Sequence, residues 1–183
     1  MLKSQRNSEK FSLTLRFFHW TGVPLMVAVY ASIWMRKLFE KGSAERKLMV
    51  SVHFGLGVLV LAWLLFRLVA YFAGKKPPIV PPVPSWQKSA LKLMQGLQWG
   101  LMAVLPLSGW LLVNAKGRVV EIGALGLEMK LPTLLQENKV LAKALNEGHE
   151  AMGVALLVLI ALHTGMALWH HVVKRDNALR RML

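Results

Sequence analysis

The sequence of 183 residues contains no cysteine. This absence excludes disulfide bonds, iron–sulfur clusters, zinc sites built on thiolates and haem attached covalently through a C-x-x-C-H motif. Acidic residues are also scarce, since 9 Asp and Glu stand against 23 Lys and Arg, and only 17% of the chain is charged. A soluble domain has about 25% charged residues, so the composition argues against a soluble protein.

Charged residues are missing altogether from four long windows. Residues 17–35 and 48–66 form two windows of 19 residues without Asp, Glu, Lys or Arg, and residues 93–115 and 151–173 form two of 23. A helix needs about 20 mostly apolar residues to cross a hydrocarbon core of roughly 30 Å. We therefore predict an all-α membrane protein in which residues 1–183 form one domain, a bundle of four spans at about 17–35, 48–67, 93–115 and 151–173.

The connections between the windows are basic or rich in proline. Five of the eight prolines fall within residues 77–84, which predicts a stiff extended connection because proline fixes φ and removes a donor. Helical apolar spacing around Leu134–Leu145 predicts a helix on the membrane surface. The net charge of +14 sits at the ends of the spans, which indicates contact with lipid headgroups and excludes nucleic acid as a partner. The side with both termini has 13 Lys and Arg against 10 on the other, which predicts cytoplasmic termini.

Six histidines lie in or beside the windows, and ionisable groups inside a membrane are functional candidates. A single histidine often only forms a hydrogen bond between helices, but the placement of these six favours a functional set. His149 and His163 are 14 residues apart, about 21 Å along a helix and close to four full turns, so they share one face. His53 lies early in the second window, at the depth of His149, and His19 lies early in the first window, near the depth of His163.

Two imidazoles that face each other across a bundle are suited to the two axial positions of a haem iron. Without cysteine, such a haem is of the non-covalent b type, and two pairs predict two haems. Zinc is the competing metal, but structural zinc needs four ligands close together. Depth counting leaves His170 as an alternative to His163, because it lies seven residues further along nearly the same face.

Three further residues are predicted to contact the haems. Gly57 and Gly153 each follow a paired histidine by four residues, on the same helix face, and would leave a flat gap for a porphyrin. Arg67 follows His53 by 14 residues and would meet a propionate of the haem nearer the termini.

The chain resembles the prokaryotic cytochrome b561 family, four-helix membrane cytochromes with two b-type haems. The matching stretches span nearly the whole chain, at residues 16–20 (RFFHW), 53–57 (HFGLG), 67–68, 77–81, 105–109 (LPLSG), 149–153 (HEAMG), 162–163, 170–171 and 176–182 (DNALRRM). The resemblance implies a bacterial inner membrane location. It also implies that the axial ligands are His19, His53, His149 and His163.

The same resemblance implies electron exchange with a membrane quinone such as ubiquinone. It assigns the quinone site to His170 and to Gln95, which stands where the family has histidine. Some members oxidise superoxide on the outer side, so superoxide or an outer redox protein is the implied partner there. This would make the chain a quinone-linked oxidoreductase. Two alternatives stay open: a cytochrome b subunit that anchors a separate dehydrogenase or hydrogenase, and a non-redox membrane bundle.

Overall fold

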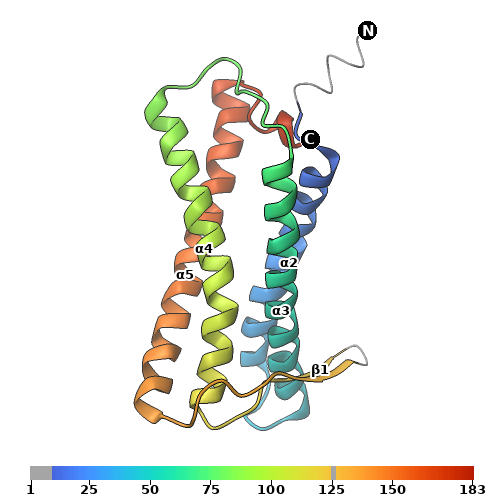
Figure 1. Ribbon diagram of the computed structural model, residues 1–183, viewed down its shortest axis with the longest axis vertical. Helices are drawn as coiled ribbons and strands as arrows, with labels where there is room; N and C mark the ends of the chain where they lie inside the picture. The colour runs from blue at the N-terminus through green and yellow to red at the C-terminus, as the bar shows by residue number, and fades with distance from the viewer. Residues whose placement is uncertain (1–9, 125–126) are drawn as a thin grey trace.

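A computed structural model describes residues 10–124 and 127–183 (Figure 1). Four long helices dominate it: α2 (Leu13–Met35), α3 (Ala44–Ala73), α4 (Ser85–Ala115) and α5 (Lys139–Trp169). All four are long and apolar enough to cross a membrane. The predicted four-helix membrane fold is thereby confirmed.

The helices extend beyond the apolar windows because polar residues cap them. The side chains of Ser12, Ser43 and Asn138 each accept a hydrogen bond from a backbone N–H in the first turn, at 3.0 to 3.3 Å. The 31 residues of α5 make a helix about 46 Å long, which exceeds the hydrocarbon core. The surface helix predicted around Leu134–Leu145 is wrong: Asn138 caps a helix that continues directly into the fourth span.

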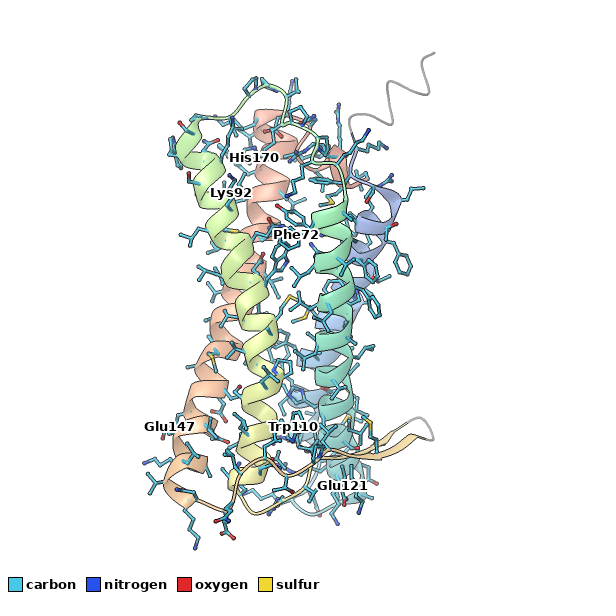
Figure 2. All side chains as sticks on the ribbon, in the orientation of Figure 1. Phe72, Lys92, Trp110, Glu121, Glu147 and His170 are labelled. Atoms are coloured by element: carbon cyan, nitrogen blue, oxygen red, sulfur yellow. The ribbon has the colours of Figure 1, made fainter. Side chains whose placement is uncertain are left out.

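The helices pack in sequence order around the bundle. Contacts join α2 to α3, α3 to α4 and α4 to α5. Figure 1 places both termini and the proline connection at one end of the bundle and a small β-hairpin at the other. We call these the termini end and the hairpin end. In Figure 2, Lys92 and His170 lie at the termini end, and Trp110, Glu121 and Glu147 lie at the hairpin end.

The hairpin is a feature that the sequence reading did not predict. Strands β1 (Glu121–Ala124) and β2 (Leu127–Lys130) pair antiparallel, and Glu121 and Lys130 form an ion pair of 2.8 Å. The hairpin lies against the start of α3, where Ser51 Oγ donates to the Glu121 carbonyl at 3.3 Å and Ile122 is buried.

The core of the bundle is an apolar layer at mid-depth. It is formed by four buried residues, which are Val60 and Leu64 on α3, Met102 on α4 and Leu156 on α5. Leu156 lies midway between His149 and His163 along α5, so the apolar layer separates two levels of histidines. On the outside of the bundle, large apolar side chains such as Phe66 and Phe72 are exposed, as expected of a surface that faces lipid.

Candidate functional site

The structure brings four of the predicted histidines together as two pairs. His53 on α3 and His149 on α5 have ring centroids 6.4 Å apart and form the hairpin pair. His19 on α2 and His163 on α5 have centroids 6.2 Å apart and form the termini pair. The hairpin pair is the one predicted from helix periodicity and depth, whereas for the termini pair those arguments left His170 open beside His163 and the family resemblance favoured His163. Each pair joins two helices that are not neighbours in sequence.

The hairpin pair has its ring protons fixed by hydrogen bonds. His53 Nδ1 lies 3.2 Å from the Val29 carbonyl oxygen, which only accepts. His149 Nδ1 lies 3.0 Å from Ser108 Oγ. The Ser108 hydroxyl donates to the Leu105 carbonyl at 2.8 Å, so its oxygen accepts from His149. Both rings therefore have the proton on Nδ1, which leaves the Nε2 lone pairs available. A histidine that binds a metal usually has this arrangement.

The termini pair has a different environment. Arg67 Nη2 lies 3.3 Å from His19 Nδ1, and Arg67 Nη1 donates to the Phe18 carbonyl at 3.3 Å. The guanidinium also covers the ring of Trp63 at 5.2 Å. Because a guanidinium only donates, His19 Nδ1 accepts here. Among the described residues, none forms a hydrogen bond with the imidazole ring of His163. Arg67 thus lies beside the termini pair, and its predicted contact with a haem propionate stays a prediction.

The spacing of both pairs fits a bis-histidine iron. Metal–imidazole bonds are about 2.0–2.1 Å long and a ring nitrogen lies about 1.1 Å from the ring centre, so two rings on one iron have centres about 6.3 Å apart. Within residues 10–124 and 127–183, no group of three or more His, Asp or Glu is placed to hold a metal ion. The residues therefore suit two-point axial ligation of a porphyrin iron and do not form a four-ligand zinc site.

The glycines near the hairpin pair differ in their surroundings. A Cβ on Gly153 would have no neighbour within 4 Å, so the helix face beside His149 has room for a flat group. A Cβ on Gly57 would instead make an ordinary contact of 3.7 Å with Pro106, so Gly57 lies against α4. Gly109 is the closest to a histidine, since a Cβ there would lie 3.1 Å from His149 Cε1.

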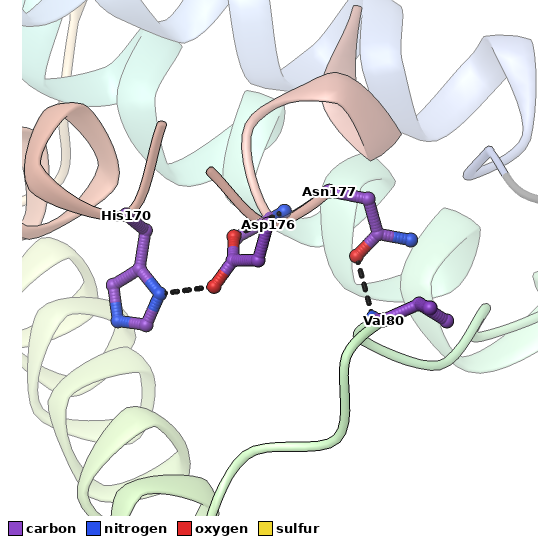
Figure 3. Close-up of polar contacts among 5 residues, drawn as sticks. Val80, His170, Asp176 and Asn177 are labelled. Carbon is purple, nitrogen blue, oxygen red and sulfur yellow. Dashed lines mark hydrogen bonds and ion pairs between the residues drawn. The ribbon is translucent and has the colours of Figure 1, made fainter. Parts of the chain in front are cut away.

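His170 does not lie in the termini pair. It is 6% exposed, and its Nδ1 lies 2.5 Å from Asp176 Oδ2 (Figure 3). Gln95 is half-buried on α4. The Gln95 side chain forms no hydrogen bond in the part of the chain that the structure describes.

Sequence reasoning missed three residues that complete these sites. Ser108 and Gly109 support His149, and the sequence signal was present in the LPLSG stretch that also matched the family. Asp176 supports His170, and it is the single acidic residue of the termini end within residues 10–124 and 127–183. Its contact with His170 depends on the way the chain folds back after α5, which helix periodicity does not predict.

Comparisons with known proteins agree with this geometry. The sequence model of the family "Prokaryotic cytochrome b561" matches residues 10–183. "Cytochrome b561 homolog 1" of Escherichia coli (strain K12) is 34% identical over 174 residues, covering 95% of this chain and 97% of that protein. "Probable superoxide oxidase CybB" of Yersinia pestis is 29% identical over 175 residues, covering 96% of each. "Cytochrome b561 homolog 2" of Escherichia coli (strain K12) is 23% identical over 176 residues.

These relatives match along almost their full length, and the four apolar helices agree with a multi-pass bacterial membrane protein. The chain therefore belongs to the prokaryotic cytochrome b561 family and is a membrane b-type cytochrome.

Proposed function

We propose that this chain carries electrons across the membrane between a redox partner at the hairpin end and a quinone at the termini end. In this proposal the hairpin pair holds one b haem and the termini pair holds a second. The observation that carries it is the presence of two histidine pairs, at 6.4 and 6.2 Å, on two levels of one bundle. Bound b haem supplies one-electron chemistry between ferrous and ferric iron.

The protein residues fix the ligands and exclude water. Val29 and Ser108 orient the two rings of the hairpin pair, so that each Nε2 lone pair is free for iron. At the termini pair, Arg67 supplies a positive charge for a haem propionate. The apolar layer between the pairs excludes water, so electrons cross a dry interval of fixed length.

The quinone site is proposed at the termini end, with His170 and Gln95 as the residues that act on the quinone and ubiquinone as the substrate. Quinone chemistry requires proton exchange, and His170 is the buried imidazole of this end. We further propose that the termini face the cytoplasm of a bacterial inner membrane, since Lys and Arg are more numerous at that end.

The partner at the hairpin end is proposed to be an anion, either superoxide or an acidic redox protein. A cavity of about 480 Å³ at this end is lined by four cations and two carboxylates. The cations are Lys116, Arg118, Lys139 and Lys143, and the carboxylates are Glu137 and Glu147. Their positive excess favours the approach of an anion.

The test is to purify the full chain in detergent and count its haem. A pyridine haemochrome assay should give about two b haems per chain, and the visible spectrum should be low-spin. Quinol in stopped flow should then reduce the haem of the purified chain without any soluble partner subunit. Fewer than one haem per chain would contradict the proposal, and a chain that dithionite reduces but quinol does not would remove the quinone role.

A further inference from the structure

The end of α5 departs from regular helix geometry. After Trp169 the helix widens into a π-helical turn, η2 (His170–Lys174), and Arg175 then takes a left-handed conformation with φ 52°. A positive φ is uncommon for a residue other than glycine, and π-helical turns are frequent at functional sites. Together they turn the chain back, so that the Asp176 N–H donates to the His170 carbonyl at 3.3 Å.

This reversal buries a carboxylate against an imidazole. Asp176 Oδ2 lies 2.5 Å from His170 Nδ1, and the two residues are only 4% and 6% exposed. The second oxygen, Oδ1, accepts from the Ala178 N–H at 2.9 Å. Because an ionised carboxylate only accepts, the proton of the contact with His170 lies on Nδ1. The other ring nitrogen, Nε2, points away from Asp176 (Figure 3).

The segment that contains Asp176 is anchored to the proline connection. Asn177 exchanges two hydrogen bonds with the backbone of Val80, at 2.8 and 3.2 Å. Arg181 Nη1 donates to the Pro77 carbonyl at 2.5 Å. Burial lowers the pKa of Arg181 below its ordinary value, and the nearby Asp176 carboxylate offsets part of that lowering. The position of the carboxylate is thus set by contacts far apart in sequence.

We propose that Asp176 is a positioning residue for His170, which holds the ring proton on Nδ1 so that Nε2 exchanges a proton with a quinone. This inference rests on the proposed function, in which His170 serves the quinone site. A quinol that is oxidised there loses two electrons, one at a time, to ferric b haem. One of its two hydroxyl protons moves to the Nε2 lone pair and the other leaves to water. The Asp176 carboxylate then stabilises the imidazolium beside it, and quinone reduction follows the reverse path.

The substitution Asp176→Asn tests the orientation directly. The amide oxygen stays with the Ala178 N–H, because that position needs an acceptor, and the amide NH₂ then faces His170 Nδ1. An NH₂ group donates, so Nδ1 must accept and the proton moves to Nε2. The ring then presents an N–H where a lone pair is required.

The experiment uses the full chain with its haem in nanodiscs and labels its histidines with ¹⁵N. The His170→Gln variant identifies the signals of this ring. In the unsubstituted chain His170 should give the Nδ1–H tautomer, and in Asp176→Asn the Nε2–H tautomer. In the same preparations, the rate of haem reduction by a short-chain ubiquinol should fall about 10²-fold at saturating quinol, with little change in KM. Dithionite should reduce both proteins to the same spectrum.

Two variants serve as controls. Asn177→Ala loosens the same segment without removing the carboxylate, and it should keep the Nδ1–H tautomer and most of the rate. Asp176→Glu keeps an acceptor and should recover part of the rate that Asp176→Asn loses. An unchanged tautomer in Asp176→Asn would overturn the inference. If the tautomer changes and the quinol rate does not, positioning by Asp176 stands and the quinone role of His170 fails.

Discussion

The two histidine pairs have nearly equal ring spacing but different surroundings. In the hairpin pair, both Nδ1 atoms donate to oxygen, one of them a carbonyl on α2 and the other a serine hydroxyl on α4. In the termini pair, the His19 ring faces a guanidinium, and the His163 ring has no hydrogen-bond partner among the described residues. Hydrogen bonds within the protein therefore orient both rings of the hairpin pair. At the termini pair, the haem of the proposed function would have to displace Arg67 from His19, and the guanidinium would then be free to contact a propionate.

The largest expected difference between the two pairs is which haem is lost when one of their histidines is replaced. His53→Ala and His149→Ala should each remove one haem, and His19→Ala and His163→Ala should each remove the other, because a b haem is held by its axial ligands. The haem content per chain should fall from about two to about one in each variant. The haem absorbance that the hairpin-pair variants lose should be the absorbance that the termini-pair variants keep, and the reverse. The assignment fails if His170→Ala removes a haem and His163→Ala does not.

A substitution in the packing beside the termini pair should have the next largest effect. A Cβ on Gly22 would lie 2.5 Å from Trp63 Cζ2, and Trp63 lies under the Arg67 guanidinium. Gly22→Ala should therefore push α2 away from α3 and destabilise the folded state by about 1–3 kcal/mol. It should lower the melting temperature and the occupancy of the termini haem. Gly96→Ala, which meets no atom within 4 Å, is the control. Equal losses from both haem sites would contradict this localised effect.

Removal of the charge of Arg67 should shift the termini haem without removing it. The cation favours the reduced, more negative state of a nearby haem. Arg67→Gln should therefore lower the reduction potential of that haem by on the order of 50–100 mV, as measured by a spectroelectrochemical titration. The potential of the hairpin haem serves as an internal control. A shift of both potentials by the same amount would mean that Arg67 does not act locally.

The smallest effect is expected from the hydroxyl group of Ser108. Ser108→Ala removes the acceptor for His149 Nδ1, and this hydrogen bond is worth about 1 kcal/mol. Loss of such a partner of a metal-binding histidine lowers the affinity for the metal by about 10–100-fold. Haem dissociation from the hairpin site to apomyoglobin should become faster, while the termini site keeps its rate. Ser32 Oγ also lies 3.3 Å from His53 Nδ1. Ser32→Ala should therefore have a smaller effect than Ser108→Ala, because the His53 ring keeps the Val29 carbonyl as its acceptor.

The charge-free apolar windows were sufficient to predict the four spans, and helix periodicity together with depth was sufficient to predict the hairpin pair. An α-helix is regular enough that 14 residues place His149 and His163 on one face, whatever surrounds them. Periodicity did not separate His163 from His170, because they differ by only about 20° around the helix. In the structure, His163 lies in regular α-helix, whereas His170 begins the π-helical turn and contacts Asp176 where the chain folds back. Local apolar spacing predicts neither the π-helical turn nor this contact. The role of each histidine stays a prediction.

The β-hairpin and the start of α5 were missed for a related reason. The strands of residues 121–130 are short, and they form against the start of α3, so the local sequence carries little of the signal. The apolar spacing around Leu134–Leu145 was genuine. Its second half, residues 139–145, belongs to the first turns of α5, because Asn138 caps the helix there, whereas residues 134–138 precede the helix.

The apolar layer formed by Val60, Leu64, Met102 and Leu156 has a consequence for the energetics of the membrane. In the proposed function, an electron that passes between haems held by the two pairs would move about 21 Å along the bundle, across this apolar layer. The move crosses roughly two thirds of the hydrocarbon, so a membrane voltage of 100 mV changes its free energy by roughly 1.5 kcal/mol. The ratio of the two reduced centres in an energised vesicle should therefore respond to voltage, in a direction that reports which end of the bundle faces the negative side.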